Sequence, residues 1–129
     1  MCIRDRLDTA RAGRYGRASL EAVDERVRHD GFDTEPDGNF RVKSPLRDLV
    51  VFRRLNLNHS PWPMRRQFNA IFCRNVLIYF AAPRQRGIVA RYADYLPPGG
   101  TLYLGHSEAL SAFGSGFSLR GSSIYERAG

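Results

Sequence analysis

The chain has 129 residues, of which 43% are hydrophobic and 12% aromatic, enough for the core of one domain, and this excludes a disordered chain. No segment approaches the roughly 20 apolar residues of a membrane span, and two cysteines are too few for a disulfide framework, so we expect a cytoplasmic protein without membrane insertion. The net charge is +7, but 19 of the 20 basic residues are arginines spread along the chain, away from aromatic clusters. We therefore expect no nucleic-acid partner.

The first half of the chain predicts short helices and a hairpin. Residues 7–30 are charged and compatible with helix, and Ser19 is a candidate N-cap for the second helical piece. In residues 31–52 a Pro-Asp-Gly turn separates two short segments, which is typical of a β-hairpin. Residues 48–57 predict one further strand. This part of the chain therefore reads as a small antiparallel insertion.

The second half predicts a βαβ unit. The apolar residues 68–73 predict a central parallel strand covered on both faces, and residues 83–96 predict a helix with a proline in its first turn. This helix would bury one apolar face, made of Ile88, Val89, Tyr92 and Leu96. Residues 101–105 predict a second strand, and residues 117–127 a closing hairpin turned at Gly121-Ser122. The fold class is α/β, with a right-handed crossover.

A polar pair, Arg74 and Asn75, follows the predicted strand directly. In open α/β sheets, ligands bind outside the carboxyl ends of the strands. The pair is therefore a candidate ligand site, and a solvated strand end is the alternative.

Two strings identify a family: IFCRNVLIYF at 71–80 and GHSE at 105–108, with weaker support from LPPGG at 96–100 and from residues 7–15 and 55–57. From about residue 7 to its end the chain resembles the catalytic domain of the CheR-type chemotaxis receptor methyltransferases, which use S-adenosyl-L-methionine to methylate receptor glutamates. The resemblance implies the C-terminal half of a doubly wound, Rossmann-like methyltransferase sheet, with residues 31–52 as an inserted small β-subdomain.

The resemblance also implies that residues 1–129 form a partial S-adenosylmethionine-dependent domain. The family's ribose-binding Asp would fall at Met1, and its glycine-containing cofactor loop and N-terminal helical domain would lie further upstream. Residues 1–6 do not match the family, and we expect them to be non-native. We also expect this half of a sheet to be inactive alone and to aggregate or stay molten, because its apolar edge and face are uncovered.

By resemblance, Asn56 and Leu57 contact the adenine, Arg74 and Asn75 line the same cofactor crevice, and Tyr79 is the catalytic residue beside the transferring methyl group. Ordinary structural roles remain open as alternatives. They are a loop hydrogen bond for Asn56, a surface ion pair for Arg74 and core packing for Tyr79. The substrate glutamate is ionised at neutral pH and needs no general base. The three histidines lack ligand spacing, so no metal is expected.

The resemblance implies the cytoplasmic domain of chemoreceptors as the protein substrate, with a receptor-tail peptide as a possible partner of the 31–52 hairpin through strand addition. A second hypothesis is a non-catalytic receptor-docking or scaffold module. A nucleic-acid methyltransferase ranks lowest, because RNVL at 74–77 is not the Asn-Pro-Pro-Tyr type of string. In the GHSE string we expect His106 to be structural and Ser107 to cap a short helix beginning at Glu108.

Overall fold

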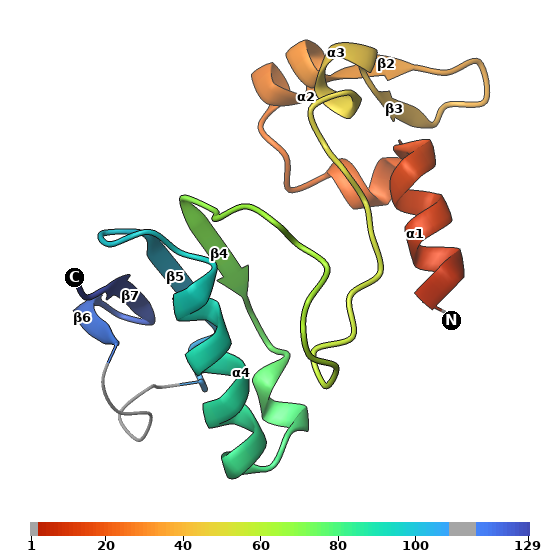
Figure 1. Ribbon diagram of the computed structural model, residues 1–129. Coiled ribbons are helices and arrows are strands. Elements are labelled where there is room, and N and C mark those ends of the chain that lie inside the picture. The colour runs from red at the N-terminus through yellow and green to blue at the C-terminus, as the bar shows by residue number, and fades with distance from the viewer. Residues whose placement is uncertain (1–2, 109–115) are drawn as a thin grey trace. The chain divides into compact units, whose positions relative to one another are not determined.

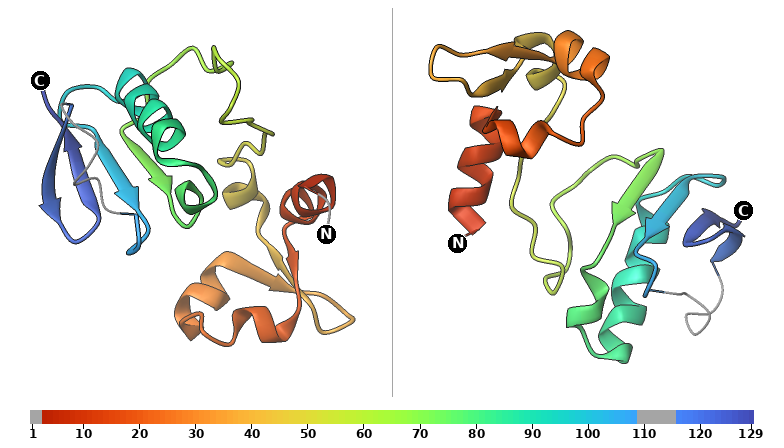
Figure 2. Two further views of the ribbon diagram at one scale, coloured as in Figure 1. Left: turned by 90° about the horizontal axis from the view of Figure 1, so that it is seen from below. Right: turned by 180° about the vertical axis from the view of Figure 1, so that it is seen from behind.

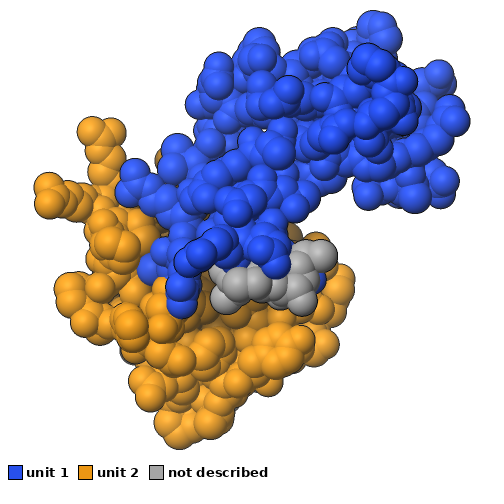
Figure 3. Space-filling view, turned by 90° about the vertical axis from the view of Figure 1, so that its right-hand side faces the viewer, with its two compact units in different colours: residues 1–55 blue, residues 56–129 orange. Residues whose placement is uncertain are grey.

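A computed structural model describes residues 3–108 and 116–129. The chain forms two compact units, Met1–Leu55 and Asn56–Gly129, which Figure 3 shows in different colours and which are described separately below. In the described part of the chain, no helix is both long enough and apolar enough to cross a membrane.

The first unit combines short helices with a three-stranded antiparallel sheet of order β1-β3-β2 (Figure 1). Its elements in chain order are α1 (Ile3–Ala12), β1 (Arg14–Tyr15), the 3-10 helix η1 (Arg17–Leu20), α2 (Glu25–Gly31), β2 (Phe32–Thr34), β3 (Phe40–Val42) and α3 (Ser44–Arg47). Gly13 follows α1 with a φ of 61°, the left-handed conformation that commonly ends a helix and that glycine adopts without strain.

The predicted hairpin is confirmed. Phe32 pairs with Val42 and Thr34 with Phe40 across β2 and β3, and the turn between them contains Gly38 at a φ of 80°. The side chain of Arg14 on β1 forms ion pairs with two carboxylates next to this turn, Glu35 and Asp37. These ion pairs join β1 to the β2–β3 hairpin.

The second helix begins later than predicted. Its N-cap is Asp24, whose side chain accepts the backbone N–H of Arg26 at 2.9 Å, whereas Ser19 lies inside the 3-10 helix η1. A carboxylate at this position caps free amides and also interacts favourably with the positive end of the helix. The prediction of Ser19 as the N-cap is therefore wrong.

The strand predicted over residues 48–57 is also wrong. The helix α3, with Pro45 in its first turn, ends at Arg47, and residues 48–57 are neither helix nor strand. Leu49 and Val51 are 80% and 73% exposed. An apolar segment becomes a strand only where another strand pairs with it, and the described residues supply no partner for this one.

The second unit is an α/β layer with a four-stranded sheet of order β4-β5-β7-β6. Its elements are β4 (Ala70–Cys73), the 3-10 helix η2 (Leu77–Tyr79), α4 (Ala82–Asp94), β5 (Thr101–Leu104), β6 (Phe117–Gly121) and β7 (Ile124–Arg127). β4 and β5 are parallel and the remaining pairs are antiparallel. Figure 2 shows α4 lying against one face of this sheet, so the predicted strand–helix–strand unit is confirmed.

The core of this unit lies between α4 and the sheet. The helix buries Ile88, Val89 and Tyr92 of the predicted face, and Leu96, two residues beyond the end of α4, is buried as well. These side chains pack on Leu102 and Leu104 of β5. The core was predictable because helical spacing places these side chains on one stripe.

The sheet is covered less completely than predicted. Ile71 and Cys73 of β4 face the core, but Phe72 between them is 70% exposed. β4 is also the end strand of the sheet, next to β5 alone. The expectation of a central strand covered on both faces is therefore not met within the described residues.

The closing hairpin is confirmed, with its turn one residue later than predicted. Gly121 pairs with Ile124, so Ser122 and Ser123 form the turn, and Ser123 takes a φ of 60°. The short helix expected to begin at Glu108 would extend over residues 109–115, which lie outside the described residues.

Candidate functional site

The chain reverses direction immediately after β4. Asn75 has a φ of 58°, a left-handed conformation that asparagine tolerates better than most residues. The next residues form η2, where Leu77 is buried at 1% exposure while Tyr79 is 81% exposed. The turn thus buries a leucine and presents Arg74, Asn75 and Tyr79 outward.

Glu108 binds the backbone of this turn. Its side chain is 5% exposed, and its two oxygens accept five backbone N–H groups. One oxygen, Oε2, accepts from Asn75 at 2.9 Å and from Gly105 at 2.8 Å. The other, Oε1, accepts from Val76 at 2.8 Å, Leu77 at 2.7 Å and Ile78 at 3.3 Å. A side chain that follows β5 therefore caps the turn that follows β4.

The ionised form of Glu108 is the one that fits here. Burial by itself raises the pKa of Glu108, but the backbone N–H groups of Gly105, Asn75, Leu77 and Ile78 outweigh burial and hold the pKa below its ordinary value of 4.5. The carboxylate is therefore charged at neutral pH, and its charge is compensated by amide dipoles.

Gln85 holds the carbonyl side of the same turn. Its Nε2 donates to the carbonyl oxygen of Leu77 at 2.9 Å and to that of Phe80 at 2.8 Å. Gln85 lies in the first turns of α4, whose N-cap, Ala81, supplies no side-chain hydrogen bond. The glutamine thus connects α4 to the turn in place of a cap.

Two neutral groups lie beside the carboxylate. Burial raises the pKa of the Cys73 thiol, and it also raises that of the Tyr92 hydroxyl, which hydrogen-bonds the thiol. Both groups stay protonated at neutral pH, so neither acts as a nucleophile or base there.

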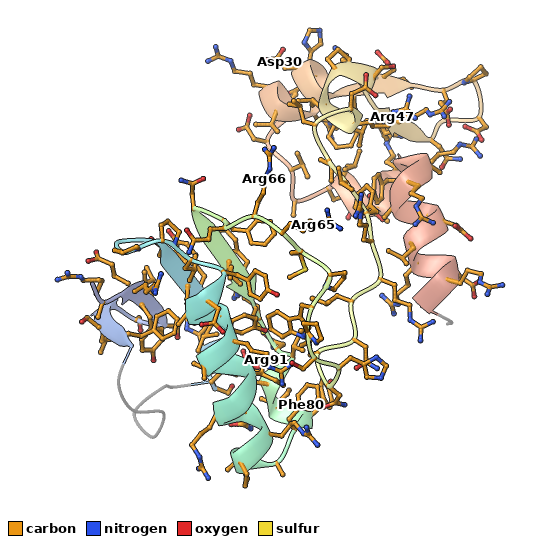
Figure 4. The ribbon with its side chains drawn as sticks, in the orientation of Figure 1. Asp30, Arg47, Arg65, Arg66, Phe80 and Arg91 are labelled. Atoms are coloured by element: carbon orange, nitrogen blue, oxygen red, sulfur yellow. The ribbon has the colours of Figure 1, made fainter. Side chains whose placement is uncertain are left out.

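A loop, residues 56–62, carries the other predicted site residues and is anchored to α4 by Arg91. Nη1 of Arg91 donates to the carbonyl oxygens of Leu57 at 3.1 Å and His59 at 2.7 Å. The guanidinium carbon lies 5.1 Å from the ring centre of Trp62, a cation–π distance. Figure 4 shows Arg91 on α4 beside this loop.

Asn56 and Leu57 are partly occupied by contacts within the chain. The side-chain oxygen of Asn56 accepts the N–H of Asn58 at 3.0 Å, the loop hydrogen bond that sequence reasoning left open. Leu57 packs against the core of the unit. The Nδ2 group of Asn56 donates to no described residue, so it is the atom left to recognise a ligand.

The predicted site residues thus fall into two groups. Arg74, Asn75 and Tyr79 share one turn, whereas Asn56 and Leu57 lie in the anchored loop, and the hydrogen bonds of the described residues do not join the two. Tyr79 is too exposed for the core-packing alternative. Within residues 3–108 and 116–129, Arg74 forms no ion pair, and no three side chains are arranged to hold a metal ion.

Sequence reasoning missed Glu108 and Gln85. The GHSE string was recognised, but its glutamate was placed at a helix start. Its position shortly after a buried strand, in a stretch with few other charges, was the available signal, because a buried carboxylate needs several donors.

The fold defines an α/β domain with a mixed sheet, and its polar residues lie after the carboxyl end of a parallel strand. The family model described as "CheR methyltransferase, SAM binding domain" matches residues 4–125, so the chain belongs to this family. S-adenosylmethionine is accordingly the cofactor of the domain.

Similar proteins carry the corresponding names. The chain is 44% identical over 108 residues to a "Probable chemotaxis protein methyltransferase" of Rhizobium etli, covering 81% of this chain and 40% of the relative. It is 40% identical to the "Chemotaxis protein methyltransferase" of Klebsiella aerogenes, over 92% of this chain and 42% of the relative. It is 38% identical to the protein of the same name from Escherichia coli, over 92% of this chain and 43% of the relative. The chain therefore spans about two fifths of the length of the curated relatives it matches.

The exposed side chains fit this cofactor chemically. S-adenosylmethionine offers an adenine edge, ribose hydroxyls, a carboxylate and a cationic sulfonium. The carboxamides of Asn56 and Asn75 suit the adenine edge or a hydroxyl. The exposed guanidinium of Arg74 suits the carboxylate and would repel the sulfonium.

Proposed function

We propose that the longer protein to which this chain corresponds transfers methyl groups from S-adenosylmethionine to glutamate carboxylates of chemoreceptors, giving glutamate methyl esters. The observation that carries the proposal is the family match across residues 4–125, which includes every candidate site residue. The chain would contribute the adenine side of the cofactor site and one catalytic residue, as the second half of a doubly wound sheet.

The roles of the chain's own residues follow from their chemistry. Asn56 would donate through Nδ2 to the adenine and Leu57 would pack on its ring, while Arg74 and Asn75 would hold the polar groups of the cofactor. When bound, the cofactor supplies both the methyl group and the leaving group. The hydroxyl of Tyr79 would orient the substrate carboxylate, so that its oxygen aligns with the reacting methyl group.

No general base is needed, because a glutamate carboxylate is ionised at neutral pH. The absence of a nucleophile–base pair among the candidate residues therefore agrees with the proposal. What the protein must supply is alignment and exclusion of water.

The β2–β3 hairpin is the proposed docking element for a receptor-tail peptide. β2 is an edge strand of the sheet β1-β3-β2 and has a free side for strand addition. Arg14 is paired with Glu35 and Asp37. Of the basic residues in the described strands β1, β2 and β3, this leaves the exposed Arg41 of β3 for an acidic peptide.

A chimera tests the enzymatic proposal. Residues 4–129 replace the matching segment of the Rhizobium etli relative, and tritiated methyl transfer to a purified chemoreceptor cytoplasmic domain is measured. We expect base-labile label released as methanol, the signature of a carboxyl methyl ester. Base-stable label would contradict the proposed substrate. Receptor binding without transfer, by the chimera and by this chain, would favour the docking or scaffold hypothesis.

A further inference from the structure

We infer that Glu108 and Gln85 are positioning residues that hold the turn 75–80 from its two sides and thereby fix where Asn75 and Tyr79 meet cofactor and substrate. The inference about the turn stands on geometry, and its link to methyl transfer rests on the proposed function. Neither residue needs to touch the cofactor for this role.

The turn has few hydrogen bonds of its own. Within it, the backbone N–H of Tyr79 donates to Val76 at 3.2 Å and that of Phe80 to Leu77 at 2.9 Å. The preceding amides, those of residues 75–78, resemble the free amides at the start of a helix, which must be satisfied by a cap. Glu108 satisfies all of them, although it lies 30 to 33 residues away in the chain.

The conformation of Asn75 depends on the same carboxylate. A left-handed φ is disfavoured for a residue with a side chain unless its surroundings hold it there. Oε2 of Glu108 binds the amide of Asn75 and that of Gly105 together, so the turn is tied to the end of β5. A Cβ on Gly105 would lie 2.6 Å from this oxygen, which shows how closely the three groups fit.

The position of Tyr79 depends on the backbone of the turn, which Glu108 and Gln85 hold. Glu108 accepts the N–H groups before it and Gln85 binds the carbonyls of Leu77 and Phe80 around it. The ring itself is 81% exposed and makes no core contact that would orient it. The place of its hydroxyl is therefore set by the backbone that the two side chains hold.

Among the residues that the structure describes, none competes with the turn amides for the charged form of Glu108. The titratable groups facing it are the thiol of Cys73 and the hydroxyl of Tyr92, both of which stay neutral at neutral pH. His106, two residues earlier, is exposed. In the described part of the chain Glu108 forms no ion pair, so the turn amides are its main compensation.

Amide exchange and coupling constants of the ¹⁵N-labelled chimera, which carries residues 4–129 in a complete sheet, test the inference. Glu108→Gln keeps one acceptor oxygen but turns an NH₂ group toward N–H donors. We expect exchange at residues 75–78 and Gly105 to accelerate about tenfold or more relative to Leu102. The three-bond H–N–Cα–H coupling of Asn75 should also leave its left-handed value. Unchanged coupling and exchange would overturn the inference, as would equal loss of protection at Leu102.

Matched variants distinguish the effect of Glu108 and Gln85 on the turn from a change in the stability of the whole unit. Glu108→Asp keeps the charge on a shorter arm and should restore part of the protection. Glu126→Gln removes a carboxylate paired with Arg120 on the closing hairpin and should leave the turn unchanged. Gln85→Leu should speed motion of the turn, whereas Gln67→Leu, which loses two longer bonds to Asp94 and Leu96, should not.

If the Glu108→Gln variant does not fold, an acid titration of the unmodified chimera tests the inference instead. The amide shifts of residues 75–78 should move together with the titration of the Glu108 carboxyl group. Independent movement would overturn the inference without any variant.

Calorimetric titration of the chimera with S-adenosylhomocysteine tests the functional link. We expect Glu108→Gln to weaken binding about tenfold and Glu126→Gln to leave it unchanged. A Glu108→Gln variant of the chimera that loses protection yet binds as tightly as the unmodified chimera would overturn the positioning role. Failure of the unmodified chimera to bind would count against the proposed cofactor site, and the exchange data would still decide whether Glu108 holds the turn.

Discussion

Phe72 on β4 and Tyr103 on β5 stack face to face, with ring centres 4.3 Å apart and planes inclined by 4°. The two residues are register partners in the parallel pair, on the face opposite Ile71 and Leu102. Cross-strand aromatic pairs stabilise strand pairing. The stack therefore supports the register of β4 and β5, which places the turn after β4 next to the carboxylate after β5.

Tyr79→Phe should lower the turnover of the chimera about 10- to 100-fold, the effect of losing one hydrogen bond to a charged group. Binding of S-adenosylhomocysteine should be unchanged, because the hydroxyl is proposed to act on the substrate. Single-turnover methyl transfer and calorimetry measure the two effects separately. Tyr103→Phe is the matched control, and equal turnover of the two variants would remove Tyr79 from the mechanism.

Gly105→Ala should destabilise the second unit by about 1–3 kcal/mol, the range for overpacking a close-fitting site. The new Cβ would lie 2.6 Å from Oε2 of Glu108 and 3.0 Å from Oδ1 of Asn75. Gly87→Ala is the control, since a Cβ there meets nothing within 4 Å and should stabilise α4 by about 0.5–1 kcal/mol. Urea denaturation of the chimera measures both changes, and the opposite order of stabilities would contradict the packing described.

Arg91→Met should release the loop 56–62 from α4. It removes the bonds to Leu57 and His59 and the cation above Trp62, at a cost of about 1–3 kcal/mol. Trp62 is the single tryptophan of the chain, so acrylamide quenching of its fluorescence reports the loop directly. The exposed Arg86 on the same helix gives the control Arg86→Met, and indistinguishable quenching in the two variants would rule out the anchoring role.

The stability of the chain should fall in acid partly through Glu108. Its folded pKa lies below the ordinary 4.5, so its contribution is complete above that value and is lost as the pH falls through the lower folded pKa. The pKa values of Asp37 and Glu126 are also lowered, by hydrogen bonds from Asn39 and Arg120 respectively. The difference in the free energy of unfolding between the chimera and its Glu108→Gln variant, measured as a function of pH, isolates the one carboxylate. A difference that does not shrink in acid would contradict this assignment.

The parts of the fold that depend on local pattern were predictable. α4 follows from an apolar stripe with a proline in the first turn, and the β2–β3 hairpin follows from a Pro-Asp-Gly turn. The prediction of a strand over residues 48–57 failed because a strand depends on a partner elsewhere in the chain. The prediction that both faces of β4 are buried failed at Phe72, because an apolar residue in a strand does not reveal which faces are covered.

The candidate site was predictable only at the level of residue types. The strings at 71–80 and 105–108 cover two segments that the structure brings into contact, but that contact joins a side chain to backbone amides. Backbone donors have no sequence signature, so the role of Glu108 required coordinates. The loop bond of Asn56 to Asn58 is local, and it was foreseen as an alternative.

The carboxylate that caps the turn also sets an order of assembly. Glu108 reaches the amides of residues 75–78 only when β5 has paired with β4, because it follows β5 in the chain. Contacts across 30 residues carry a larger loop-closure cost than the local hairpin β6–β7. We therefore expect the turn to acquire its shape late in folding, after the crossover has closed, so that an incompletely folded chain would not present Tyr79 in its native position.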